Sequence, residues 1–414
     1  MANIAAPTTT EKKAKRAVSL FGGNIRQYTM IIALVVIVAL FGILTSGDSL
    51  LPASVTDIIL QNSAILILAI GMMLCILTGG NIDLSVGSVV CLIGAMAAML
   101  ITMQHLPVWL GIILALAGGF AAGGFQGFLI AYVRIPPFIT TLAGMLLFRG
   151  LGNVILQGQT IGLPAEYISL TNSYIPDPFH IDGFKLVPSV ATESELNILC
   201  VGVGVLLALV YVFFAMRKRY KKRKYNFELT PAWAFALQTA AIAIVTVVFF
   251  LWLARNQGIP AVLILVGFLI VGYSFFMQKT VPGRYVYAMG GNEKAARLSG
   301  INTKKVMFFV YMNMGVLASI AGLVYSARAN AAYPSAGDMY ELDAIGACFI
   351  GGASAVGGVG TIIGAIVGAL IMGVINQGMT YLAVDSYWQR VIKGCVVLLA
   401  VAFDVFTKSR AKSA

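Results

Sequence analysis

Two long apolar runs flank the polar sequence Gly290-Gly291-Asn292-Glu293-Lys294-Ala295-Ala296-Arg297-Leu298-Ser299-Gly300-Ile301. This stretch predicts a single short, capped helix. The side-chain oxygen of Asn292 can accept an N–H of the first turn, and Gly300 suits the left-handed residue that ends a helix. Glu293 and Arg297 match the helix dipole and form an i,i+4 pair. Isolated helices of this length are marginal in water, so we expect this one to lie on the surface of a second protein.

The composition is that of an integral membrane protein. Of the 414 residues, 59% are hydrophobic and 11% charged, and the mean hydropathy is +0.90. Soluble proteins have about 25% charged residues. We expect no cleavable signal peptide, because the basic cluster at 12–16 precedes an apolar run that has no small-residue cleavage site. The net charge of +12 does not indicate nucleic-acid binding, because the charges fall in short segments between apolar runs.

Apolar runs of about 18 or more residues predict membrane spans. The chain has twelve candidate runs, near 28–45, 58–78, 85–103, 108–132, 138–156, 196–216, 231–254, 260–277, 306–326, 343–356, 360–381 and 388–406. The tenth is short, so we expect an all-α, polytopic transmembrane bundle of about 12 spans, within a range of 10 to 12. The predicted parts are an N-terminal tail (1–27), one transmembrane domain (28–406) and a C-terminal tail (407–414), with loops at 157–195, 217–230 and 278–305.

The distribution of Lys and Arg predicts the orientation, because cytoplasmic segments are enriched in both. With both tails and the segments 133–137, 217–230 and 278–305 inside, 22 of the 28 Lys and Arg residues are cytoplasmic. Loop 157–195 is then extracytoplasmic. The basic block 217–224 is expected to touch anionic lipid head groups.

Two segments predict broken helices, near 78–87 and 351–360. Each has a glycine pair, a few polar or small residues and a further glycine before a helix of small residues. Such a pair hints at an internal repeat, and short glycine-interrupted segments are where backbone carbonyls can line a cavity. Two ordinary tight loops are the alternative.

Polar residues in or near these runs are the candidates for a translocation pathway. An acid in a membrane is costly and usually functional, but Asp83 has two open roles: it could line a pathway or cap the helix that begins near Leu84. Buried amides can also tie helices together. The candidate pathway residues are Thr78, Asn81, Asp83, Ser85, Gln126 and Asn376. The outer acids Asp338, Glu341 and Asp343 are expected to be solvated, with a docking role as the alternative.

Glycines spaced by four residues predict close helix packing in a bilayer. They are Gly119, Gly123 and Gly127, and Gly360, Gly364 and Gly368. Their pattern indicates a multi-helix bundle and says nothing about cargo.

No pattern indicates catalysis. The chain has no G-x-x-x-x-G-K-[ST] phosphate loop, no H-E-x-x-H or G-x-S-x-G motif and no Cys/His cluster. We therefore expect a protein that is not an enzyme, with no catalytic residue, metal or cofactor of its own.

Three motifs stand out together: 77–88 (LTGGNIDLSVGS), 283–301 (GRYVYA through GGN to AARLSGI) and 350–361 (IGG through GGVGT). In these motifs the chain resembles the permeases of bacterial ABC-type sugar importers, in the ribose/xylose/arabinose/galactose group. The resemblance covers about residues 30 to 406. The long insertion at 157–258 is more like the xylose or multiple-monosaccharide subgroup than the shorter ribose-type permeases.

The resemblance implies a homodimeric pore in the bacterial inner membrane that carries a xylose-like pentose or related hexose by alternating access. Its implied partners are a second permease copy, an extracytoplasmic sugar-binding protein and a cytoplasmic ATPase that binds the ATP and Mg. The segment that couples to the ATPase would comprise Gly290, Gly291, Asn292, Glu293, Ala295, Ala296, Arg297, Leu298, Gly300 and Ile301. Two rival functions are an ion-coupled secondary transporter that uses Asp83 and a membrane enzyme acting on lipid-linked substrates.

Overall fold

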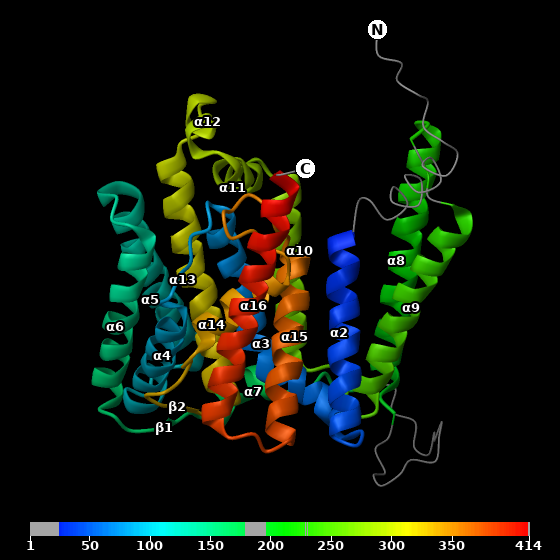
Figure 1. Cartoon of the computed structure of the whole chain (residues 1–414). Helices are drawn as coiled ribbons and strands as arrows, with labels where there is room; N and C mark the ends of the chain where they lie inside the picture. The colour runs from blue at the N-terminus through cyan, green and yellow to red at the C-terminus, as the bar shows by residue number, and fades with distance from the viewer. Residues whose placement is uncertain (1–24, 179–195, 228, 230, 413–414) are drawn as a thin grey trace. The chain divides into compact units, whose positions relative to one another are not determined.

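The computed structural model describes residues 25–178, 196–227, 229 and 231–412. Its regular structure is almost entirely helical (Figure 1), which confirms the predicted all-α membrane bundle. Within these residues the strands are β1 (Ile161–Gly162) and β2 (Ala331–Ala332), which pair antiparallel with Ile161 opposite Ala332. Residues 1–24 of the predicted N-terminal tail and 179–195 of the predicted outer loop lie outside the described residues.

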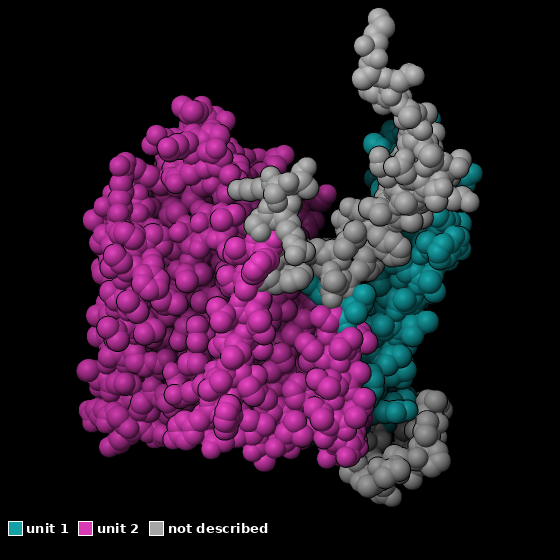
Figure 2. All heavy atoms as spheres, in the orientation of Figure 1, with its two compact units in different colours: residues 1–32, 176–259 teal, residues 33–175, 260–414 magenta. Residues whose placement is uncertain are grey.

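The chain divides into two compact units, coloured separately in Figure 2. The smaller comprises residues 1–32 and 176–259 and contains the helices α8 (Ile198–Lys224) and α9 (Ala232–Ala254). The two pack as an antiparallel pair, with Gly204 of α8 against the Phe250 side chain of α9. Side chains of this pair are largely exposed and apolar, as expected of helices that face lipid.

The larger unit comprises residues 33–175 and 260–414, and α2 (Ile25–Leu44) leads into it. Its helices are η1 (Asp48–Leu50), α3 (Pro52–Leu77), α4 (Val86–Ala97), η2 (Ala98–Met103), α5 (Val108–Phe128), η3 (Leu129–Val133), α6 (Pro137–Leu156), α7 (Ala165–Asn172), α10 (Ala261–Lys279), α11 (Val281–Gly291), α12 (Glu293–Leu298), α13 (Thr303–Arg328), α14 (Tyr340–Ile350), α15 (Ile362–Tyr381) and α16 (Ser386–Lys412). Of these, η2 and η3 are π-helical turns that continue α4 and α5.

The core of the larger unit forms around α3. Every residue from Ala64 to Leu77 is buried, and α3 packs against α13, α15, α14 and α10. A helix with apolar residues on all its faces is usually buried on all sides, and α3 has apolar residues on all its faces. The other helices of the unit are therefore arranged about it, with α12 at one end of the bundle (Figure 1).

The small-residue pattern explains how α5 and α13 approach each other. A methyl group at Gly315 would lie 2.3 Å from the Gly119 carbonyl oxygen and 2.6 Å from Gly123 Cα. Gly364 and Gly368 of α15 meet the Gly351 and Ala347 carbonyls in the same way. Gly360, which the four-residue spacing had placed in that helix, precedes α15 and has a φ of +154°.

The helix ends differ from several of the predicted segment limits. Among the described residues, nine helices are long and apolar enough to cross a membrane. The tenth predicted run, 343–356, contains only the 11-residue α14, about 16 Å long and too short to cross. The basic block 217–224 is not a loop but the end of α8, where cations favour the helix dipole. Likewise α7 lies within 157–195, and α16 continues through 407–412 of the predicted tail.

Candidate coupling site

Three side-chain caps divide the segment from 280 to 305 into consecutive helices. The Thr280 hydroxyl accepts from Gly283 N–H at 3.3 Å and begins α11. The Asn292 side chain accepts from Ala295 N–H at 3.0 Å and begins α12, and the Asn302 side chain accepts from Lys305 N–H at 3.1 Å and begins α13. Each cap satisfies a backbone donor that a helix start leaves free. The predicted loop 278–305 is therefore two helices and their caps.

The predicted caps of the short helix are confirmed, but its limits were set too wide. Gly300 has a φ of +86°, and its N–H and that of Ile301 donate to the carbonyls of Arg297 and Ala296, the pattern of a Schellman ending. The helix, α12, spans only Glu293–Leu298. Gly290 and Gly291 are the last residues of α11.

The faces of α12 differ sharply in exposure. Ala296 is 5% exposed and packs inward, whereas Leu298 is 87% exposed. Glu293 and Arg297 are also exposed, and the predicted ion pair between them does not form within the described part of the chain. The exposed side of α12 therefore carries Glu293, Arg297 and Leu298.

Five glycines bring the three sequence motifs together, and we call them the glycine junction: Gly79, Gly80, Gly290, Gly357 and Gly358. A methyl group at Gly290 would lie 1.7 Å from the Leu77 carbonyl oxygen and 2.5 Å from Gly358 N. One at Gly80 would lie 2.0 Å from the Ala355 carbonyl oxygen, and one at Gly357 would lie 2.5 Å from Gly79 Cα. Only glycine permits such backbone contacts, so α11 and the two broken segments touch main chain to main chain.

Hydrogen bonds reinforce this junction. Leu77 is the last residue of α3, and its carbonyl, which has no partner within the helix, accepts from Gly358 N–H at 3.1 Å. The Tyr287 hydroxyl of α11 donates to the Gly360 carbonyl at 2.9 Å. Asp404 of α16 accepts from Ala355 N–H at 3.1 Å. Sequence reasoning missed Asp404, although a lone acid near the end of the last apolar run was a signal.

The break between α3 and α4 also holds a buried polar cluster. Asp83 is 2% exposed, and its Oδ1 accepts from Ser85 N–H at 2.8 Å and from the Ser85 hydroxyl at 2.6 Å. The same hydroxyl lies 3.1 Å from Gln126 Oε1 of α5. Burial raises the pKa of the Asp83 carboxyl, which lies between two candidate spans. Asp83 thus bonds to Ser85, the residue that precedes α4, and the cluster links that start to α5.

The remaining candidate pathway residues are divided between two places. Thr78 and Asn81 bond locally within the broken segment: the Thr78 hydroxyl donates to the Cys75 carbonyl, and the Asn81 amide donates to the Thr78 carbonyl. Asn376 does not belong to this group. It lies on α15, where its side chain neighbours Asp343 of α14.

Comparisons with known proteins show which family the chain belongs to. The family model described as "Branched-chain amino acid transport system / permease component" matches residues 54–182 and 184–401. The chain belongs to this permease family. The "Xylose transport system permease protein XylH" of Escherichia coli (strain K12) is 36% identical over 96% of this chain and 98% of its own, and that of Haemophilus influenzae is 37% identical over 94% and 98%. The "Ribose import permease protein RbsC" of Escherichia coli (strain K12) is 34% identical over 90% and 92%. No solved structure matches the chain.

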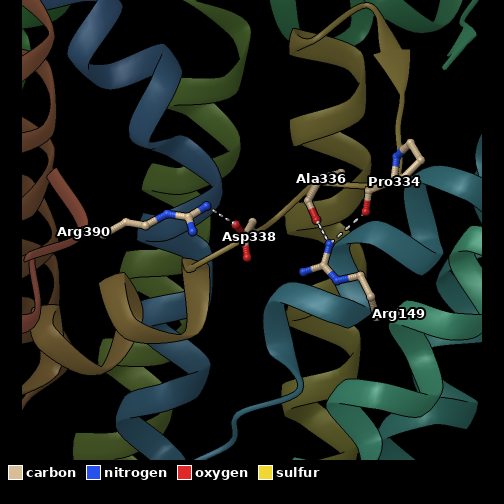
Figure 3. A network of polar contacts seen from close by, with 5 residues as sticks. All are labelled: Arg149, Pro334, Ala336, Asp338 and Arg390. Atoms are coloured by element: carbon tan, nitrogen blue, oxygen red, sulfur yellow. Dashed lines mark hydrogen bonds and ion pairs between the residues drawn. The ribbon is translucent and has the colours of Figure 1, made fainter. Parts of the chain in front are cut away.

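The permease also has a polar network at the far end of α13 from α12, which the sequence analysis did not find (Figure 3). The Arg149 guanidinium of α6 donates to the carbonyls of Pro334 and Ala336, at 3.2 and 2.5 Å. Arg390 of α16 pairs with Asp338 at 3.0 Å, and both side chains are more than half exposed. The signal available was that these arginines lie in or beside apolar runs, where a cation needs a partner.

A second ion pair corrects the expectation that the outer acids are solvated. Lys393 of α16 lies 2.9 Å from Asp343, whose side chain is 1% exposed. Glu341 is half-buried, with one carboxylate oxygen beside Gly87. Of the three acids, only Asp338 is exposed. Buried charges are kept where they are paired, so Asp343 and Lys393 tie α14 to α16.

Proposed function

We propose that this chain is the membrane-spanning subunit of an ABC-type importer that carries a monosaccharide, a xylose-like pentose or related hexose, into the cytoplasm. The xylose and ribose permeases that it resembles along 90% or more of their lengths support the substrate class. Two copies of the permease form the pore, a separate ATPase binds and hydrolyses ATP with Mg, and an extracytoplasmic binding protein delivers the sugar. The membrane is the bacterial inner membrane.

The observation that carries this proposal is the position of α12. It is a capped helix at one end of the bundle, and its Leu298 side chain is exposed. The single residue Asn292 joins it to α11. Through Gly290, α11 bears directly on the end of α3 and on the 351–360 segment. A displacement of α12 by the ATPase therefore reaches both broken segments through main-chain contacts, and these segments shift to open the pore to one side at a time.

The orientation has support from the larger unit. Segments 133–137 and 278–305, both assigned to the cytoplasm by their Lys and Arg residues, line one cleft through Arg134, Arg297 and Lys304. Segments that share a cleft lie on the same side of the membrane. We place α12, and both tails, in the cytoplasm.

Two substitutions test the coupling role. Ala296→Trp places a large side chain where the native residue is 5% exposed, and Gly300→Val puts a β-branched residue at a φ of +86°. In proteoliposomes with the ATPase and binding protein, we expect sugar uptake and sugar-stimulated ATP hydrolysis to fall at least about tenfold, or ~1.4 kcal/mol, while membrane insertion is retained. Lys305→Ala, at an exposed position at the start of α13, is the control. Uptake by both variants equal to that of Lys305→Ala would refute the coupling role.

The same proteoliposomes test the substrate and the energy source. Labelled xylose, ribose and leucine are compared, since the family description names branched-chain amino acids. We expect pentose uptake that requires ATP and the ATPase and survives an ionophore. Uptake that persists without the ATPase and collapses with the ion gradient would establish ion coupling instead.

A further inference from the structure

A basic cleft lies beside α12 in the larger unit. Its volume is about 620 Å³, and Glu293, Arg297 and Lys304 line it from the α12–α13 side. Across from them are Ile130 of η3 and Arg134, at the junction between α5 and α6. The α5–α6 junction thus forms a second wall, which no sequence motif had identified.

The backbone at this junction holds Arg134 in an unusual conformation. Its φ is +68°, in the left-handed region, which side-chain-bearing residues adopt at a cost. The N–H of Ile135 donates to the Leu129 carbonyl across this turn, and Pro136 and Pro137 begin α6 at once. Such conformations persist where the surroundings enforce them and gather at functional sites. The turn places a cation on the cleft wall.

The charge in the cleft is unbalanced. Three cations and one acid line it, and none of the four side chains makes an ion pair or hydrogen bond with another described residue. All four are exposed. Apolar side chains are also exposed on α12 and η3. Leu298 of α12 is 87% exposed, and Tyr132 and Val133 of η3 are 43% and 52% exposed. Exposed apolar side chains beside a cleft that carries a net positive charge are typical of a protein interface rather than of a small-anion pocket.

We infer that this cleft is a second docking point for the ATPase subunit, which places a carboxylate-bearing segment between Arg134, Arg297 and Lys304 while its own groove holds α12. The inference rests on the proposed function and names a contact that α12 alone does not provide. Charge complementarity favours a negatively charged occupant, and the wall shared with α12 favours the ATPase over an anionic lipid head group. The pairing would also restrict the orientation of the ATPase, because the ATPase could rotate about a contact made by the six-residue α12 alone. A second contact point would oppose that rotation.

Charge reversal at the cleft tests the contact. The permease is placed in nanodiscs of neutral lipid, and the dissociation constant of the purified ATPase subunit is measured at low and high salt. We expect Arg134→Glu and Lys304→Glu each to raise the dissociation constant at least about tenfold at low salt, mainly through slower association. The difference in dissociation constant between these variants and wild type should become smaller at high salt, because salt screens the charges. Lys305→Glu makes the same charge change at the next residue, outside the cleft, and should shift the constant less than about twofold.

Each outcome decides something. If the wild-type permease does not bind the ATPase, the proposed function fails and this inference fails with it. If wild type binds and all three variants bind equally well, the cleft is not a docking point, while the proposed function stands. If the variants weaken binding only in nanodiscs that contain anionic lipid, the cleft is a lipid site and the inference is wrong.

Discussion

The glycine junction and the charged contacts at the other end of α13 are held together by different kinds of interaction. At the glycine junction the contacts join main chain to main chain, as between Gly290 and the Leu77 carbonyl. At the other end of the 26-residue α13, long charged side chains reach across to partners, as from Lys393 to Asp343. We call these contacts of Arg149, Arg390 and Lys393 the outer network. A main-chain contact has no rotamer that can absorb a displacement, whereas an ionic side chain can swing and re-form. We therefore expect the junction to transmit movement and the outer network to supply stability.

The largest expected effect breaks the buried half of the outer network. Lys393→Met would leave the carboxyl of Asp343, whose side chain is 1% exposed, without its cationic partner. Removing one member of a buried pair costs about 3–5 kcal/mol, so we expect a clear drop in the thermal unfolding midpoint of the detergent-purified permease.

The double variant Lys393→Met with Asp343→Leu is the control. It removes both charges and should recover most of the lost stability, because no uncompensated charge remains. A single variant as stable as wild type would show that this pair does not hold α14 to α16.

The next effect tests the main-chain contact. Gly290→Ala adds a methyl group 1.7 Å from the Leu77 carbonyl oxygen, so α11 must move away from the junction. Overpacking of this kind costs about 1–3 kcal/mol, and we expect stability and sugar-stimulated ATP hydrolysis to fall together. Unfolding midpoint and hydrolysis are measured on the same preparations.

The neighbouring residue offers a matched variant. A methyl group at Gly291 meets nothing within 4 Å, so Gly291→Ala should leave the unfolding midpoint unchanged. If both alanines destabilise the permease equally, helix α11 rather than the junction contact accounts for the effect.

Local features of this fold could be predicted from the sequence. The caps at Asn292 and Gly300 depend on residues within a few positions of each other, and the breaks near 78–87 and 351–360 follow from adjacent glycines. That the breaks meet beneath α11 could not be predicted, because a glycine shows where a close approach is possible and not which backbone approaches it. Hydropathy alone also left 343–356 undecided, and this apolar run contains a helix of only 11 residues.

Long-range pairs escaped the sequence analysis for the same reason. Lys393 and Asp343 are 50 residues apart, and Arg149 and Pro334 are 185 apart. No periodicity links such positions, and a charged residue at the edge of an apolar run looks the same whether it is solvated or paired. The Asp83 cluster was partly accessible, since Asp83 and Ser85 are two residues apart, but the third member, Gln126, comes from another helix.

We expect the smallest effect from the exposed ion pair of the outer network, which can be compared with the buried pair. Arg390 and Asp338 lie 3.0 Å apart, almost the separation of Lys393 and Asp343, but their side chains are 58% and 52% exposed. Exposed pairs contribute about 0–1 kcal/mol, because water and salt screen them. In a double-mutant cycle of Arg390→Gln and Asp338→Asn, followed by thermal unfolding, we expect a coupling energy below about 1 kcal/mol that declines as salt is added. A coupling as large as that of Lys393 with Asp343 would show that distance rather than burial governs the strength of these pairs.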